Sequence, residues 1–261
     1  MNKKLIVANW KNHPDTLAQA QDILDFVNDY LSSVNKKDFS LFSLVFCPPF
    51  VFIEEVAKIL KMSSLEDRSF LGAQDIAIDD KIALTGEISG GMLKKLGVDH
   101  IIIGHSERRW KLGESDETVN KKLKLALKDE LIPIVCIGEK TRDRDFKNFL
   151  KKQINDTFKG LSSEEIAKCI IAYEPVWAIS TNPGAYSDTP ASALESIFVI
   201  RNYLTTYYLL HTTPLFLYGG SVNSKNVSGF LSQKEINGVL VGGASVVKEE
   251  FVEILKIASK L

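Results

Sequence analysis

Short apolar runs alternate with longer amphipathic segments along the 261-residue chain. The runs lack the polar alternation of a half-exposed strand, which is typical of strands that are buried on both faces. Seven runs are clear and one, at 69–73, is weaker. The clear runs lie at 5–8, 44–47, 101–103, 132–137, 169–173, 215–218 and 239–241. This pattern restricts the chain to folds in which helices cover a buried sheet.

The segments between the runs have the spacing of one apolar helix face, with hydrophobic residues every three or four positions. The first such stripe lies within 17–31, and others lie within 53–60, 119–127, 193–204 and 247–258. Eight strand candidates with helical segments between and after them predict a (β/α)₈ barrel, although the pattern alone leaves a doubly wound sheet open. Since no linker, repeat or low-complexity tract divides the chain, we expect one α/β domain over residues 1–261.

The charge balance argues against nucleic acid or a membrane surface as a partner. The chain has 32 basic and 33 acidic residues, so it produces no field of one sign and must bind any anion at a local site. Asn9 interrupts the first apolar run too early for a secretory signal, and the three cysteines show no disulfide or metal-binding spacing. We therefore expect a cytoplasmic protein.

Polar and glycine-rich residues follow the apolar runs directly. Asn9 and Lys11 follow the first run, Gln74 the third, and His105 the fourth. Glu174 follows the sixth run, and glycine pairs follow the seventh and eighth. Because the active sites of such barrels lie at the carboxyl ends of the strands, we expect these residues to gather at one rim.

Six motifs at these positions resemble the signatures of the triosephosphate isomerase family, in family order and over essentially the whole chain. They are Asn-Trp-Lys at 9–11, Thr-Gly-Glu-Ile-Ser at 85–89, Gly-His-Ser-Glu-Arg-Arg at 104–109, Ala-Tyr-Glu-Pro-Val-Trp-Ala-Ile at 172–179, Tyr-Gly-Gly-Ser-Val at 218–222 and Leu-Val-Gly-Gly-Ala-Ser at 240–245. The resemblance implies a TIM barrel. It also implies a glycolytic and gluconeogenic isomerase that uses no cofactor or metal and interconverts dihydroxyacetone phosphate and D-glyceraldehyde 3-phosphate.

The resemblance also implies roles for individual residues. Glu174 corresponds to the base that moves the proton, against the alternative of a structural ion pair. His105 corresponds to the electrophile, and this family is itself the usual worked example of a neutral imidazole at a helix N-terminus. Lys11 corresponds to the cation that stabilises the phosphate and the enediolate. The alternative for Lys11 is a lysine on the surface that contacts only solvent, as most lysines do.

Two further residues are expected beside this trio. Asn9 resembles the residue that positions Lys11 and the developing oxyanion. Glu107 resembles a supporting carboxylate near Lys11, and its alternative is a surface ion pair with Arg108 or Arg109.

Glycines after the last two strands predict the phosphate site. Gly242 and Gly243 would let backbone amides approach an anion, and Ser221 would add a donor from the preceding loop. Each glycine pair alone is more often a tight turn. By resemblance, the amide of Ser180 would complete the phosphate contacts.

Residues 175–185, called the lid below, resemble the family's mobile loop over the substrate. The family usually has Gly-Thr-Gly-Lys after Ala-Ile, whereas this chain has Ser-Thr-Asn-Pro at 180–183. We expect Asn182 to replace a glycine with left-handed backbone and Gly184 to carry some of the bend. The expected consequence is altered lid kinetics with activity retained.

The segment 74–87 is long for a barrel loop, and it resembles the loop that docks into a neighbouring subunit. The resemblance implies a two-fold homodimer with Gln74, Thr85, Glu87 and Arg108 at the interface. Thr85 would approach the partner near Asn9 and Lys11. The alternative is an exposed loop that contacts nothing.

Two other functions fit the sequence less well. A metal-dependent sugar-phosphate epimerase would need clustered histidines and acidic residues at the strand ends, and only His105 and Glu174 are prominent there. A catalytically inactive barrel kept as a binding protein would not be expected to retain Lys11, His105 and Glu174 together.

Overall fold

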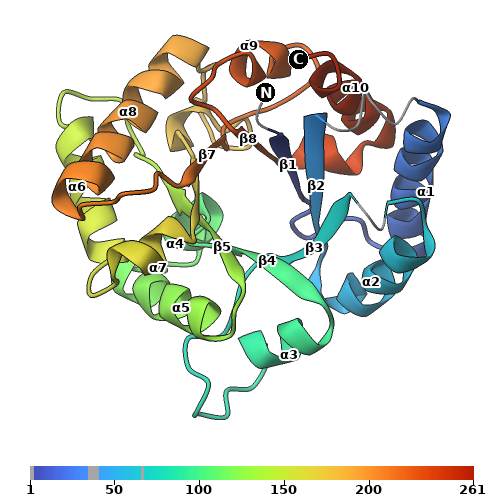
Figure 1. The fold of residues 1–261 in the computed structure, drawn as a ribbon, viewed down its shortest axis with the longest axis horizontal. Helices are drawn as coiled ribbons and strands as arrows, with labels where there is room; N and C mark the ends of the chain where they lie inside the picture. The colour runs from blue at the N-terminus through green and yellow to red at the C-terminus, as the bar shows by residue number, and fades with distance from the viewer. Residues whose placement is uncertain (1–2, 35–40, 66–67) are drawn as a thin grey trace.

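The computed structural model describes residues 3–34, 41–65 and 68–261. Its eight strands run parallel and close into a barrel in chain order, with β8 paired back to β1 (Figure 1). The strands are β1 Lys4–Asn9, β2 Phe42–Cys47, β3 Ser69–Ala73, β4 Val98–Ile103, β5 Ile132–Ile137, β6 Ile170–Tyr173, β7 Leu215–Tyr218 and β8 Gly238–Val241. The predicted (β/α)₈ barrel is confirmed, and the doubly wound alternative is wrong.

Helices surround the barrel on its outer side (Figure 1). They are α1 Leu17–Ser33, α2 Ile53–Met62, α3 Gly90–Lys95, α4 Ser106–Lys111, α5 Asp116–Lys128, α6 Phe146–Thr157, α7 Ser163–Ala167, α8 Pro190–Tyr207, α9 Val227–Leu231 and α10 Lys248–Ala258. Three short 3₁₀ turns follow strands: η2 Phe50–Phe52, η3 Val176–Ala178 and η4 Gly243–Val246. No helix of the described ranges is both long and apolar enough to cross a bilayer.

Local sequence explains where the longer helices begin. Thr16 caps α1 through a reciprocal pair of hydrogen bonds with Gln19, and Ser115 and Thr189 cap α5 and α8 by accepting from a backbone amide three residues on. The predicted stripes face the barrel, because nearly all of their residues are buried. Ala57 and Leu127 are partly buried, and Leu17 and Val247 are exposed, at 37% and 51%.

The core lies on both sides of the strands. Val7, Val45, Ile102 and Leu217 belong to the cluster inside the barrel. Alternate strand residues such as Ile101 face outward and pack in the layer between strands and helices. Because both faces of each strand are buried, the strands read as continuous apolar runs.

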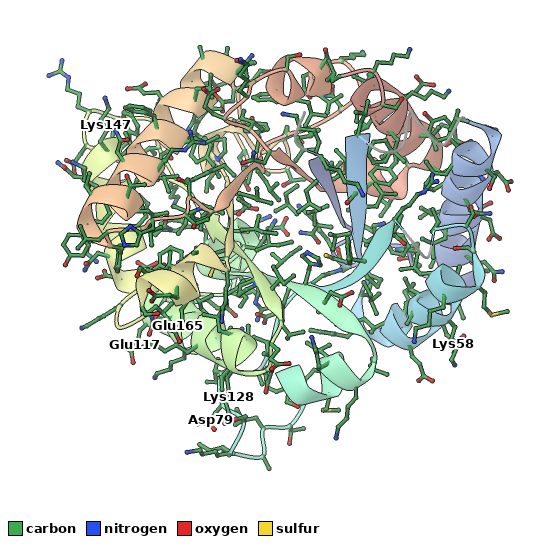
Figure 2. All side chains as sticks on the ribbon, in the orientation of Figure 1. Lys58, Asp79, Glu117, Lys128, Lys147 and Glu165 are labelled. Atoms are coloured by element: carbon green, nitrogen blue, oxygen red, sulfur yellow. The ribbon has the colours of Figure 1, made fainter. Side chains whose placement is uncertain are left out.

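The loop between β3 and α3 extends away from the body of the molecule (Figure 1). The amide of Ala77 donates to the carbonyl of Ile88 at 2.9 Å, which closes its base. An ion pair between Asp80 and Lys128 fastens it to α5, and Figure 2 shows Lys128 beside the loop at Asp79. The loop therefore has a defined shape even though most of its side chains are exposed.

Candidate active site

A cavity of about 350 Å³ opens at the carboxyl ends of the strands. Its lining comes from the ends of β1, β4, β7 and β8 and from the lid. Among the lining residues are Asn9, Lys11, His105, Ser180, Ser221, Gly242 and Gly243. The structure thus brings together at one rim residues that lie far apart in the sequence.

Glu174 lies against His105, which lines this cavity, although Glu174 is not itself one of the lining residues. Its Oε1 atom is 3.0 Å from Nε2 of His105, and its Oε2 atom accepts a hydrogen bond from the amide of Ser106 at 2.7 Å. No donor among the described residues forms a well-aligned hydrogen bond to Oε1. Since the residue is only 1% exposed, this oxygen is shielded from water, and Nε2 of His105 is its polar neighbour.

The position of His105 at the start of α4 fixes its tautomer. Its Nδ1 atom accepts a hydrogen bond from the amide of Glu107 at 3.2 Å, as an N-cap side chain does. An imidazole that accepts through Nδ1 carries its proton on Nε2 when neutral. The N–H of His105 therefore belongs to the nitrogen nearer Glu174.

Lys11 has a left-handed backbone, with φ of 55°, which is uncommon for any residue with a Cβ atom. Its amide donates to Oδ1 of Asn9 at 3.0 Å, and its carbonyl accepts from Nε2 of Gln74 at 2.7 Å. Its Nζ atom is 2.8 Å from Oε1 of Glu107. Contacts on three sides hold this strained residue in place.

Glu107 is a half-buried carboxylate whose pKa lies below its ordinary value. Burial alone would raise this pKa, but the hydrogen bond and charge of Lys11, together with the nearby His105 and Lys111, outweigh that effect. Its partner is Lys11, while Arg108 pairs with Glu114. Arg109 pairs with Asp116. The alternative that Glu107 pairs with Arg108 or Arg109 is therefore wrong.

At the other end of the cavity, glycines leave room beside Lys11. A Cβ atom on Gly242 would come 3.2 Å from Cε of Lys11, and one on Gly220 would collide with the hydroxyl of Tyr218 at 2.3 Å. The amide of Ser180 donates to Oγ of Ser221 at 2.7 Å. The lid and the loop after β7 thus meet at this end of the cavity.

The backbone of the lid differs in part from expectation. Among the described residues only Lys11, Glu130 and Leu209 have positive φ without being glycine, so the left-handed conformation expected of Asn182 is wrong. Gly184 does take it, with φ of 75°. Asn182 uses its side chain instead, donating from Nδ2 to the carbonyl of Val176 at 2.9 Å.

The cysteines are buried, and the nearest to the site is unsuited to nucleophilic work. Burial, and next the negative charge of Glu174, raise the pKa of the Cys136 thiol well above its usual value. Across the described ranges, no three histidine, cysteine, aspartate or glutamate side chains gather in the manner of metal ligands.

Three contributors to the site were not predicted from sequence in the roles they take. Gln74, expected at a subunit interface, binds the carbonyls of Lys11 and Cys47. Ser106 supplies the amide that holds Glu174. Glu139 accepts from the indole of Trp177 at 3.0 Å. Only their positions directly after strands pointed to them.

The residues expected at a subunit interface lie in two places, on the projecting loop and around a hollow beside Lys11. Thr85 and Glu87 are exposed on the projecting loop. Arg108 lies beside a hollow of about 370 Å³ on the far side of Lys11, and its side chain pairs with Asp75 and Glu114. Gln74 lines the same hollow.

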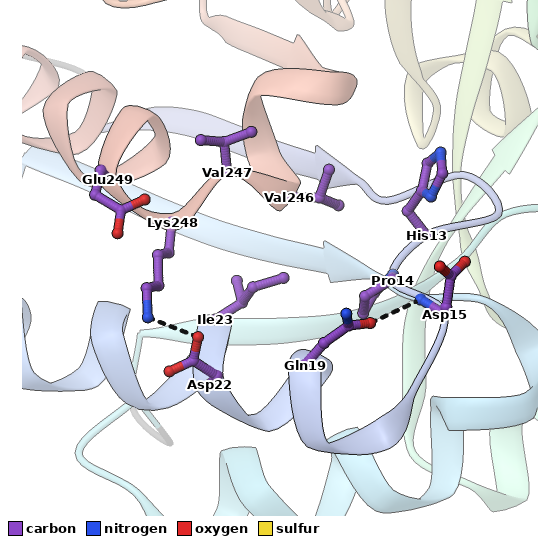
Figure 3. Close-up of a pocket in the computed structure, with 10 residues that line it drawn as sticks. All are labelled: His13, Pro14, Asp15, Gln19, Asp22, Ile23, Val246, Val247, Lys248 and Glu249. Atoms are coloured by element: carbon purple, nitrogen blue, oxygen red, sulfur yellow. Dashed lines mark hydrogen bonds and ion pairs between the residues drawn. The ribbon is translucent and has the colours of Figure 1, made fainter.

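His13 lines a separate pocket of about 470 Å³ between the starts of α1 and α10 (Figure 3). Two polar contacts join residues of its lining. The amide of Asp15 donates to Gln19, and Lys248 pairs with Asp22 at 2.6 Å. None of the residues predicted for the active site lines this pocket.

Comparison with known proteins is consistent with this geometry. The family model described as Triosephosphate isomerase matches residues 4–258. The triosephosphate isomerase of Caldanaerobacter subterraneus subsp. tengcongensis is 40% identical over 98% of this chain and 99% of its own length. Those of Alkaliphilus oremlandii and Dictyoglomus thermophilum are each 39% identical over 98% of this chain, covering 99% and 100% of their own lengths.

Proposed function

The chain belongs to the triosephosphate isomerase family, and we propose that it interconverts dihydroxyacetone phosphate and D-glyceraldehyde 3-phosphate through an enediolate. The reaction moves one proton between adjacent carbons and another between the oxygens that those carbons carry. It needs a base, donors for two oxygens and groups that bind the phosphate. The lining of the cavity has residues suited to the last two needs, and Glu174, in contact with His105, is suited to the first.

In this proposal Glu174 is the base. It leaves the amide of Ser106, removes a proton from carbon 1 of dihydroxyacetone phosphate and returns it to carbon 2. The electron pair left on carbon 1 forms the carbon–carbon double bond of the enediolate, and the carbonyl electron pair moves to the oxygen of carbon 2. The hydroxyl proton on the oxygen of carbon 1 then passes by way of Nε2 of His105 to the oxygen of carbon 2, and the double-bond pair takes up the proton at carbon 2 as the new carbonyl forms at carbon 1. Its near-complete burial excludes water that would compete for the carboxylate.

His105 and Lys11 stabilise the negative charge that develops on oxygen. The Nε2–H of His105 donates to the two substrate oxygens, because Nδ1 is occupied by the amide of Glu107. Lys11 supplies a fixed positive charge, which Asn9 and Glu107 keep in place.

The phosphate is bound at the far end of the cavity by the amides of Ser180, Gly242 and Gly243 and by the hydroxyl of Ser221. Lid closure then excludes water and retains the enediolate, which would otherwise lose phosphate by elimination. The proposed reaction uses no cofactor or metal.

The observation that carries the proposal is the 3.0 Å approach of Glu174 to His105 beside a cavity that Lys11 also lines. A general base must lie within hydrogen-bond distance of the proton that it removes. Because Glu174 and His105 are in contact, both can reach the adjacent carbon and oxygen atoms of one small substrate.

A coupled isomerase assay with and without a chelator tests this function. We expect activity that survives the chelator and falls by about 10²-fold or more in Glu174→Asp, because the shorter side chain misplaces the base. Absence of activity in the purified wild-type chain would overturn the proposal. Loss of activity with the chelator would favour the metal-dependent epimerase class.

We also propose that the chain is a cytoplasmic homodimer. Ile82 and Leu84 on the projecting loop are 61% and 38% exposed, which suits a surface covered by a partner. The hollow beside Lys11 would receive the partner's loop, so that Thr85 approaches Asn9 and Lys11 and Glu87 approaches Arg108. Such a two-fold arrangement buries both loops at once.

A further inference from the structure

The lid of this chain is folded back on itself by contacts between its two halves. The carbonyl of Val176 accepts from the side chain of Asn182 at 2.9 Å, and the carbonyl of Ile179 accepts from the amide of Asn182 at 2.9 Å. The carbonyl of Trp177 accepts from the amide of Tyr186, the residue after the lid, at 3.2 Å. Three carbonyls of the first half are thus bound by the second half.

An aromatic stack reinforces these hydrogen bonds. The rings of Trp177 and Tyr186 lie 4.6 Å apart with an interplanar angle of 27°. Trp177 is itself fixed, because its indole donates to the buried carboxylate of Glu139. Tyr186 is 56% exposed, and the stack with Trp177 covers one face of its ring.

The outer face of the lid has little other support. A cavity of about 530 Å³ separates it from Trp110 at the end of α4 and from Lys140 after β5. On the lid side the cavity is lined by Trp177, Asn182 and Gly184. Since neighbouring elements do not pack closely against this face, internal contacts must maintain the shape of the lid.

Ser180 lies at the exposed tip between the anchored residues. Its amide donates to Ser221 at 2.7 Å, at the end of the cavity where the phosphate is proposed to bind. The direction of this amide depends on the conformation of Ile179, the residue before it, whose carbonyl is bound by the amide of Asn182. The internal contacts of the lid therefore control where the donor points.

We propose that Asn182 and Tyr186 are positioning residues, which keep the Ser180 amide directed at the substrate's phosphate by binding back to Val176 and Trp177. The inference rests on the proposed function, because it concerns the phosphate of that substrate. It gives a role to Asn182, in the part of the lid that departs from the family pattern, and to Tyr186 directly after the lid.

Two variants each remove one contact of the lid, and a third keeps the aromatic ring at position 186. Tyr186→Ala deletes the stack, and Asn182→Asp replaces the amide donor with an acceptor of the same shape. We expect each to weaken the binding of inorganic phosphate about 3- to 10-fold and to raise the share of turnovers that release phosphate by a similar factor. Tyr186→Phe keeps the stack and should stay within about twofold of wild type on both readouts.

Tyr207→Ala is the matched control. Tyr207 is also an exposed, stacked tyrosine, 58% exposed and 5.0 Å from Tyr203, but it lies at the far end of α8. Unchanged phosphate affinity and phosphate release in both Tyr186→Ala and Asn182→Asp would overturn the inference. Because phosphate affinity is measured without turnover, the inference is tested even if the wild-type chain isomerises no triose phosphate, which is the result that would remove the proposed function.

Discussion

At the scale of single residues, the site depends on a lysine held in an unfavourable conformation. The left-handed backbone of Lys11 costs on the order of 1–3 kcal/mol, which its contacts with Asn9 and Gln74 offset. The Asn-Trp-Lys motif predicted which residue would be there. It could not predict the conformation, because Gln74 lies 63 residues away along the chain. The same limit applies to the contact between Glu174 and the amide of Ser106.

The first prediction concerns the anchor of Lys11. Glu107→Gln removes the negative charge that faces Nζ, and a hydrogen bond to a charged group contributes about 1.5–3 kcal/mol. We expect kcat to fall roughly tenfold, because the lysine is held less firmly while the substrate forms the enediolate. The unfolding temperature should fall by only a few degrees, roughly 2–4 °C for each kcal/mol lost.

Glu117→Gln is the control for this change. Glu117 pairs with Lys121 at 2.9 Å on the exposed face of α5, where Figure 2 places it on the outer ring of helices. A kcat in Glu107→Gln that matches the wild type and Glu117→Gln would contradict the role given to Glu107.

At the scale of elements, the strands were easier to predict than the helices. Strands buried on both faces leave a continuous apolar run, and all eight predicted runs became strands. The stripe of α6 was missed because Gln153 and Thr157 lie on its buried face, where Gln153 binds the amide of Gly138. The conformation of Asn182 was also mispredicted, because its side chain found a backbone partner that local sequence does not reveal.

The second prediction concerns β4, which carries a buried histidine. Burial lowers the pKa of His100 to about 4, and its ring packs edge-on against Phe70 at 5.1 Å. The unfolded chain therefore binds a proton at this residue near pH 6.5, whereas the folded chain does not until about pH 4. This residue's contribution to stability is thus fully present above the unfolded pKa and is lost as the pH falls toward the folded one.

We expect His100→Phe to remove this pH dependence. Between pH 7 and pH 4.5 the wild type should lose up to about 3 kcal/mol of unfolding free energy more than the variant does, as urea titrations would measure. Equal losses in the two proteins over that range would show that His100 is not the titrating group.

At the scale of the whole molecule, closure of the barrel is what assembles the site. Parallel pairing of β1 with β8 brings Asn9 and Lys11 beside Gly242, although they lie at opposite ends of the chain. Because every strand runs in the same direction, every residue that follows a strand reaches the same rim. This is why motifs spread over the sequence could predict one cavity.

The third prediction concerns assembly. Thr85→Arg places a long charged side chain at the tip of the projecting loop, where a partner's hollow should be too narrow for it. We expect light scattering to show a change from twice 29.1 kDa to 29.1 kDa, together with a fall in kcat of about tenfold or more. Thr206→Arg makes the same change at an exposed position of α8 and should leave the mass in solution unaltered. A wild-type chain with the mass of a monomer would contradict the proposed dimer.

The central claim is that Glu174 and His105 act together on one triose phosphate, with Glu174 carrying the proton. Proton NMR of dihydroxyacetone phosphate during turnover in D₂O measures this directly, because a proton held by a carboxylate exchanges with solvent before it is returned. We expect the wild type to place deuterium on the reacting carbons, and Glu174→Gln to slow this incorporation by about 10²- to 10⁴-fold. Incorporation and isomerisation at the wild-type rate in Glu174→Gln would contradict the account.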